Sequence, residues 1–141
     1  MPDRRDVIKW AAAAPTLVPA LAMMAGAAGS LPNAVMDERS ATLTHEAFGD
    51  LRVYFDGATA QLKSLTAGSL RLKPGMSPHP PHQHPEEEIM VVTEGSGEIS
   101  VEGKVTKVAS GGIMFCGAGK LHGIVNTGKS PLLFYYWKWQ A

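Results

Sequence analysis

Residues 75–95 read GMSPHPPHQHPEEEIMVVTEG and contain three of the five histidines of the chain. His82 and His84 are two positions apart, so on an extended strand both imidazoles project from the same face. This is the simplest way for one strand to supply two nitrogen ligands to a metal ion. His79 stands outside this pair, and we interpret it as a plain loop residue, with a rim residue or proton shuttle as the alternative.

A carboxylate and a distant histidine complete the candidate site. Glu88 shares the parity of the pair, but four extended residues would separate it from His84 by about 13 Å. Because metal–ligand bonds are only about 2 Å long, we expect the chain to fold back near Pro85. His122 follows a loop of small residues that allows close backbone approach. The predicted metal ligands are His82, His84, Glu88 and His122; the alternative is a solvated, proline-rich turn without a ligand.

The sequence after residue 50 consists of short runs of aliphatic and aromatic residues separated by glycine-containing turns. No stretch after residue 28 shows the apolar spacing of a helix. The runs predicted as strands are residues 51–55, 62–72, 89–93, 97–101, 105–108, 113–116, 123–125 and 132–139. Many short strands at near-regular spacing are typical of a sandwich or barrel, so the sequence predicts an all-β fold.

Two stretches resemble the motifs of the cupin superfamily. The first reads Gly75-x6-His82-x-His84-x3-Glu88-x6-Gly95, and the second reads Gly111-x5-Gly117-x-Gly119-x2-His122-x3-Asn126. The chain departs from the pattern by one extra residue before His82 and by Gly117, where the family usually has proline. Neither departure touches a ligand position. The resemblance implies a single cupin domain, which is a jelly-roll (double-stranded β-helix) barrel, commonly dimeric. It also implies one internal divalent ion, which is iron, manganese, nickel, cobalt, copper or zinc.

The first residues of the chain have the order of an export signal. A charged start is followed by an alanine-rich run and by small residues suited to cleavage. The segment from Asp3 to Lys9 resembles the twin-arginine motif, with Asp3 where serine or threonine is usual. The alternative is a membrane anchor, but Pro15 and Pro19 interrupt a weakly apolar run. We therefore expect a periplasmic or otherwise exported protein without stable membrane insertion after cleavage.

These patterns predict three regions: a signal peptide over residues 1–27, a linker or arm over residues 28–50, and the barrel over residues 51–141. The 13 basic and 13 acidic side chains balance, so no electrostatic footprint for nucleic acid is visible. Cys116 is the single cysteine, which excludes an intrachain disulfide and a zinc finger. We interpret Cys116 as a small buried residue, with a redox-sensitive thiol as the alternative.

Three further features are interpreted from the residues alone. His45 is expected on the surface. Glu86 and Glu87 are interpreted as a solvated acidic turn, with a general base as the alternative. Alternation along the last run places Phe134, Tyr136 and Lys138 on one face and Tyr135, Trp137 and Trp139 on the other. Because only one face can point inward, the outer rings favour a homodimer contact.

Two functions remain open at this point. The first is a metal-dependent enzyme of the dioxygenase, lyase or isomerase type that acts on a small organic molecule. The second is a non-catalytic periplasmic binding protein that captures a sugar acid or another small oxyanion at the metal. No catalytic acid, base or nucleophile beyond the four ligands is assigned, because one fold hosts many chemistries.

Overall fold

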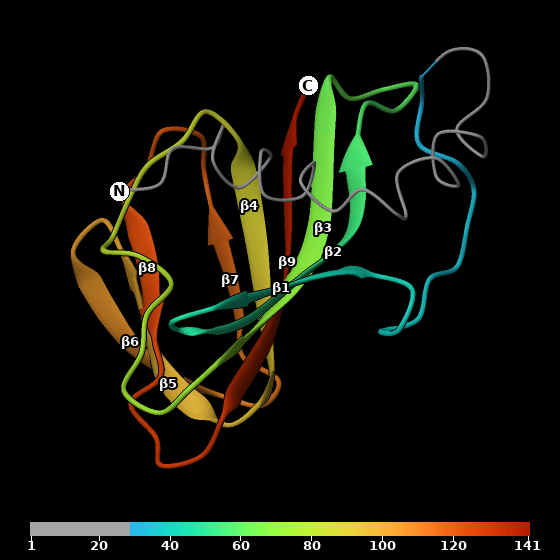
Figure 1. Ribbon diagram of the computed structural model, residues 1–141. Coiled ribbons are helices and arrows are strands. Elements are labelled where there is room, and N and C mark those ends of the chain that lie inside the picture. The colour runs from blue at the N-terminus through green and yellow to red at the C-terminus, as the bar shows by residue number, and fades with distance from the viewer. Residues whose placement is uncertain (1–28) are drawn as a thin grey trace.

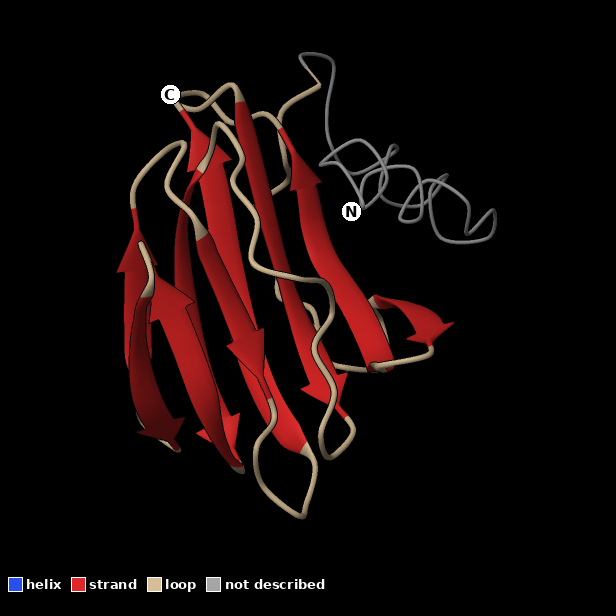
Figure 2. Ribbon diagram, turned by 90° about the vertical axis from the view of Figure 1, so that its left-hand side faces the viewer, coloured by secondary structure: helices blue, strands red, loops and turns tan. Residues whose placement is uncertain are grey.

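The computed structural model describes residues 29–141. Nine strands form in this part of the chain: β1 (Thr42–Glu46), β2 (Gly49–Gly57), β3 (Ser64–Leu72), β4 (Glu87–Glu94), β5 (Ser96–Val101), β6 (Lys104–Ala109), β7 (Ile113–Cys116), β8 (His122–Val125) and β9 (Leu132–Gln140). No helix lies among them, so the predicted all-β class is confirmed (Figure 2). It follows that the described residues include no helix long and apolar enough to cross a membrane.

The strands form two antiparallel sheets. The larger sheet has the order β1-β2-β3-β9-β4-β7, and the smaller sheet has the order β6-β5-β8. Figure 1 shows the small sheet beside the larger one, with the long connection between β3 and β4 running beside β8 of the small sheet. This is the predicted jelly roll, and the connection between β3 and β4 carries the histidine pair.

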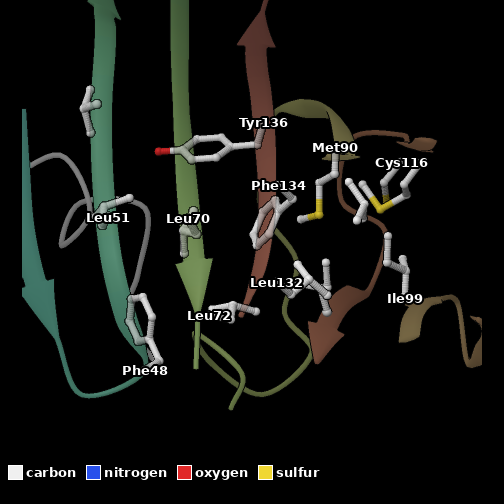
Figure 3. Packing of buried hydrophobic residues seen from close by; sticks show 14 residues of the cluster. Phe48, Leu51, Leu70, Leu72, Met90, Ile99, Cys116, Leu132, Phe134 and Tyr136 are labelled. Carbon is white, nitrogen blue, oxygen red and sulfur yellow. The ribbon is translucent and has the colours of Figure 1, made fainter. Parts of the chain in front are cut away.

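Apolar side chains from both sheets fill the space between them. Alternation along β4 and β9 turns Met90, Val92, Phe134 and Tyr136 inward, and Ile99 and Ile124 reach them from the small sheet. Figure 3 shows Met90, Phe134 and Ile99 among the packed side chains of this cluster. Burying a side chain of this size contributes about 1.5–3 kcal/mol. The core therefore fixes the strands on which the candidate site is built.

The arm predicted over residues 28–50 contains a strand that the sequence did not reveal. β1 pairs along its whole length with β2, from Thr42 opposite Val53 to Glu46 opposite Gly49. Its single large apolar residue, Leu43, is exposed, so no buried face marked it as a strand. Hydrogen bonds to its neighbour hold this edge strand in place. The predicted signal peptide lies outside the described residues.

Candidate metal centre

Backbone hydrogen bonds bring the two histidine-bearing segments together. His82 N–H donates to His122 O, and His122 N–H donates to His82 O, both at 2.9 Å. Gly119 N–H donates to His84 O at 2.8 Å. The prediction that the pair lies on a regular strand is wrong, because residues 83 and 84 belong to no strand and His82 forms an isolated bridge. The expected fold-back is present as a bend at Pro85, directly before β4.

The structure brings the four predicted residues to one point. One side-chain donor atom from each of His82, His84, Glu88 and His122 lies within 4.8 Å of the others. Glu88 Oε2 is 2.8 Å from His84 Nε2 and 2.8 Å from His122 Nε2. Two ligands at right angles on an ion with bonds of about 2.1 Å would be about 3 Å apart. The distances from Glu88 to His84 and His122 therefore fit a first-row divalent metal.

The second nitrogen of each buried imidazole already has an acceptor. His122 Nδ1 donates to Lys120 O at 3.0 Å, and His84 Nδ1 faces Glu86 O at 3.2 Å. Carbonyl partners of this kind hold the hydrogen on Nδ1 and leave Nε2 as the ligand atom. In the neutral rings the two Nε2 lone pairs then point at a carboxylate oxygen. Acceptors that face one another in this way suit a shared cation.

Electrostatics favour the metal-binding forms of Glu88 and His82 but not that of His122. Burial raises the pKa of Glu88, but hydrogen bonds from His122 and His84, which form when Nε2 carries a proton, outweigh it and lower that pKa to about 2. Burial and the neighbouring His79 and His122 lower the pKa of His82 to about 3. Burial lowers the pKa of His122, whereas its bonds to Glu88 and Lys120 O raise it above the usual value. At neutral pH the cluster thus offers an ionised carboxylate and a neutral His82.

Glu86, next to the site, is buried rather than solvated. It was expected in a solvated turn, yet its side chain is only 2% exposed. A carboxylate oxygen lies 3.2 Å from His84 Nδ1 on the side away from Glu88. The interpretation of a solvated acidic turn is therefore wrong for Glu86. Two neighbouring glutamates look equivalent in sequence, and only the bend before β4 decides that Glu86 turns inward.

Of the other residues considered in the sequence, His79 and Cys116 lie next to the cluster and His45 lies away from it. His79 stacks on His82 with ring centroids 3.6 Å apart, so it belongs to the rim of the site. Cys116 is buried, as predicted, and its Sγ lies 3.4 Å from His122 Nδ1. His45 is exposed, also as predicted, and pairs with Asp50 far from the cluster. His79 thus lies at the rim, Cys116 packs behind His122, and His45 lies on the surface.

A small cavity of about 70 Å³ opens beside the cluster. Its walls are mostly apolar and include Phe48, Leu51, Leu70, Met90 and Phe134. Two polar residues that sequence reasoning did not assign, Tyr136 and Lys138, also line it. The alternation along the last strand had already placed Tyr136 and Lys138 on the same face as Phe134, and this face points inward.

The sequence profile of the cupin domain family matches residues 68–138. The chain belongs to the cupin family. An RmlC-like cupin from Shewanella frigidimarina is 17% identical, with 75% of this chain and 89% of that chain covered and a TM-score of 0.59. For KdgF from a Halomonas species the identity is 18%, the coverage 77% and 94%, and the TM-score 0.61.

An oxalate oxidase structure is 22% identical to this cupin over 54% of the chain and 42% of its own length, with a TM-score of 0.50. At these identities the likeness establishes the fold alone. No curated protein matches the chain significantly. The family and the clustered donor atoms together fit a metal ion inside the barrel, and the reaction has to be argued from the residues of the site.

Proposed function

We propose that this cupin binds one divalent metal ion through His82, His84, Glu88 and His122 and acts enzymatically on a small organic molecule. The observation that carries the proposal is that Glu88 Oε2 lies 2.8 Å from the Nε2 atoms of both His84 and His122. The Nδ1 atom of each of these rings faces a backbone carbonyl oxygen, which holds the ring in place. Three imidazoles and one carboxylate leave positions open on an ion that takes five or six ligands. When bound, the ion supplies Lewis acidity or, if it is iron, dioxygen chemistry.

The residues of the chain have three tasks in this proposal. The buried imidazoles and carboxylate hold the ion at a fixed point. The apolar wall formed by Phe48, Leu51 and Phe134 excludes bulk water from the substrate, which strengthens polar interactions there. His79, on the rim, limits access to the space beside His82. The identity of the metal narrows the reaction type: iron would favour dioxygenase chemistry, and zinc or manganese would favour lyase or isomerase chemistry.

The test combines metal content with turnover. Elemental analysis of protein from its native host should find one divalent metal per chain in the wild type and in the surface control His45→Gln. His122→Ala, checked for folding by circular dichroism, should lose both metal and turnover. A folded His122→Ala protein with undiminished turnover would contradict metal catalysis. Stoichiometric metal and ligand binding without consumption of the ligand would instead indicate the non-catalytic binding protein.

Two further proposals concern the surroundings of the site. We propose that residues 1–27 direct export to the periplasm through a twin-arginine-type signal and are removed, which leaves the arm over residues 28–50, whose β1 joins the larger sheet, and the barrel over residues 51–141. We also propose that the protein is a homodimer. The support is the outer face of the larger sheet, where Ile113, Phe115 and Trp137 are exposed, since apolar side chains gathered on one sheet face favour association.

A further inference from the structure

Lys138 is a buried cation beside the candidate metal centre. On β9 its Cα pairs with that of Glu88 on β4, so both side chains start from facing positions on the inner side of the sheet. The residue is only 7% exposed, and it lines the cavity next to the cluster. Its place in the fold therefore directs a positive charge into the barrel.

No carboxylate in the described part of the chain forms an ion pair with Lys138. Glu88, the nearest carboxylate by register, is instead held by His84 and His122. The ammonium lies 6.0 Å from the ring centroid of Tyr136, which is a weak cation–π contact. Because burying an unpaired ammonium is costly, a site that serves packing alone would favour an apolar residue here. A buried charge that faces a cavity points to a ligand of opposite sign.

Tyr136 lines the same cavity and carries a second unsatisfied donor. The hydroxyl of Tyr136 is buried and has no hydrogen-bond partner within residues 29–141. The strand opposite makes room for it, since a side-chain carbon on Gly68 would lie 2.6 Å from this oxygen. Buried hydroxyls usually have partners. An oxyanion in the cavity would supply an acceptor both for Tyr136 and for Lys138.

Charge and size restrict the ligand further. A divalent ion held by neutral imidazoles and Glu88 keeps excess positive charge, and Lys138 adds to it; of the neighbouring groups, Glu86 behind His84 offsets part of this charge. An anionic ligand would therefore be favoured. A cavity of about 70 Å³ holds only a few heavy atoms, comparable to a few water molecules. Only a small acid, or the acid end of a longer molecule, fits this space.

We propose that Lys138 determines specificity by binding the carboxylate group of a small carboxylic acid in the cavity beside the metal cluster, with Tyr136 as the second donor. This inference rests on the proposed metal-dependent function and names its substrate class. The residue acts by binding and positioning the substrate, and no bond is formed or broken at its ammonium.

The experiment compares glycolate with glycolamide, which have nearly the same shape but differ in charge. Calorimetric titration is performed on metal-loaded wild type, on Lys138→Met and on the exposed control Lys107→Met. Glycolate affinity should fall by about tenfold to a hundredfold in Lys138→Met, as expected for loss of a bond to a charged group. Lys107→Met should match the wild type, and glycolamide should bind weakly and equally to all three proteins.

A stability measurement separates this role from a structural one. Without ligand, Lys138→Met should have a melting temperature equal to or above that of the wild type, because an uncompensated buried charge is replaced by an apolar chain of similar length. Equal glycolate affinity in wild type and Lys138→Met, equal losses for glycolate and glycolamide, or no binding of glycolate to wild type would each overturn the inference.

Elemental analysis of the same samples keeps the two proposals apart. If metal-loaded wild type and metal-loaded Lys138→Met bind glycolate with equal affinity, the inference is refuted and the proposed metal site stands. Wild type that takes up no metal would refute the proposed function. In that case the substrate class is tested on the metal-free proteins. Glycolate should then raise the melting temperature of wild type but not that of Lys138→Met. Any other result would refute the inference as well.

Discussion

Glu88 and His122 are 34 residues apart in the chain and meet at 2.8 Å inside the barrel. Glu88 lies on β4 of the larger sheet and His122 begins β8 of the smaller one, so their contact joins the two layers. The same glutamate oxygen receives His84 from the connection that precedes β4. Glu88 is therefore the residue whose removal tests the whole cluster.

Glu88→Gln should lose metal while it keeps the barrel. The amide preserves the volume of the side chain but removes the negative charge that attracts a cation. Loss of a group that only hydrogen-bonds to a metal ligand already lowers metal affinity by about tenfold to a hundredfold. Loss of a ligand itself should lower the affinity at least as much. Elemental analysis and competition with a chelator measure the effect. Metal affinity equal to that of wild type would exclude Glu88 as a ligand.

The metal-free protein should lose stability as the pH falls from about 4.5 to about 2. The pKa of Glu88 in the folded protein lies below its usual value of 4.5. The stabilisation is therefore present above the unfolded value and is lost as acid protonates the folded carboxylate. Urea unfolding of metal-free wild type and Glu88→Gln across this range provides the measurement. Parallel curves for the two proteins would show that Glu88 does not contribute.

Gly68→Ala should destabilise the barrel by about 1–3 kcal/mol, the usual cost of forcing extra volume into a packed core. The added carbon would lie 2.5 Å from Arg52 O and 2.6 Å from the Tyr136 hydroxyl. The backbone oxygen cannot move without disturbing the pairing of β2 with β3. Gly117→Ala is the matched control, because its new carbon meets nothing closer than 3.8 Å. Equal denaturation midpoints for both variants would contradict the packing argument.

Phe115→Glu should convert the proposed homodimer into a monomer. Phe115 is 59% exposed on the outer face of β7, and a charge there would have to be desolvated in any contact made by this face. Sedimentation equilibrium measures the mass. Val105→Glu, a change at a similarly exposed residue on β6, should leave the mass unchanged. A monomeric wild type would refute the homodimer, and a dimer that survives Phe115→Glu would place the interface elsewhere.

Replacing Arg4 and Arg5 by lysine should block export through a twin-arginine route while leaving the folded barrel unchanged. Immunoblots of periplasmic and cytoplasmic fractions, with the amino-terminal sequence of the periplasmic form, measure the outcome. The expected result is cleaved wild type in the periplasm and uncleaved variant in the cytoplasm. Unaltered export of the double-lysine variant would point to a different signal.

The sequence was most informative where function restricts spacing. The separation of His82, His84 and Glu88 predicted both a shared site and a fold-back near Pro85, and the structure contains both. The loop of small residues before His122 predicted the remaining member of the cluster, and the cupin-like spacing around it agreed. Strand alternation sorted the last strand correctly, with Tyr136 and Lys138 buried and Trp137 exposed.

Features that depend on tertiary contacts were not predictable in the same way. β1 lacks an apolar face, so its pairing with β2 left no periodic signal in the sequence. Glu86 resembles its neighbour Glu87, and its burial follows from the bend that precedes β4. The lack of a partner for Lys138 became visible only when the hydrogen bonds of Glu88 were known.

The reciprocal backbone bonds between His82 and His122 use no side-chain atom. Either imidazole could therefore be exchanged for another donor during evolution while the two segments stay joined and the barrel stays closed. Lineages could then alter the preferred metal, and with it the chemistry, through single substitutions that leave the scaffold intact. Such a separation of framework from ligand identity offers a physical reason why one small barrel can serve many reactions.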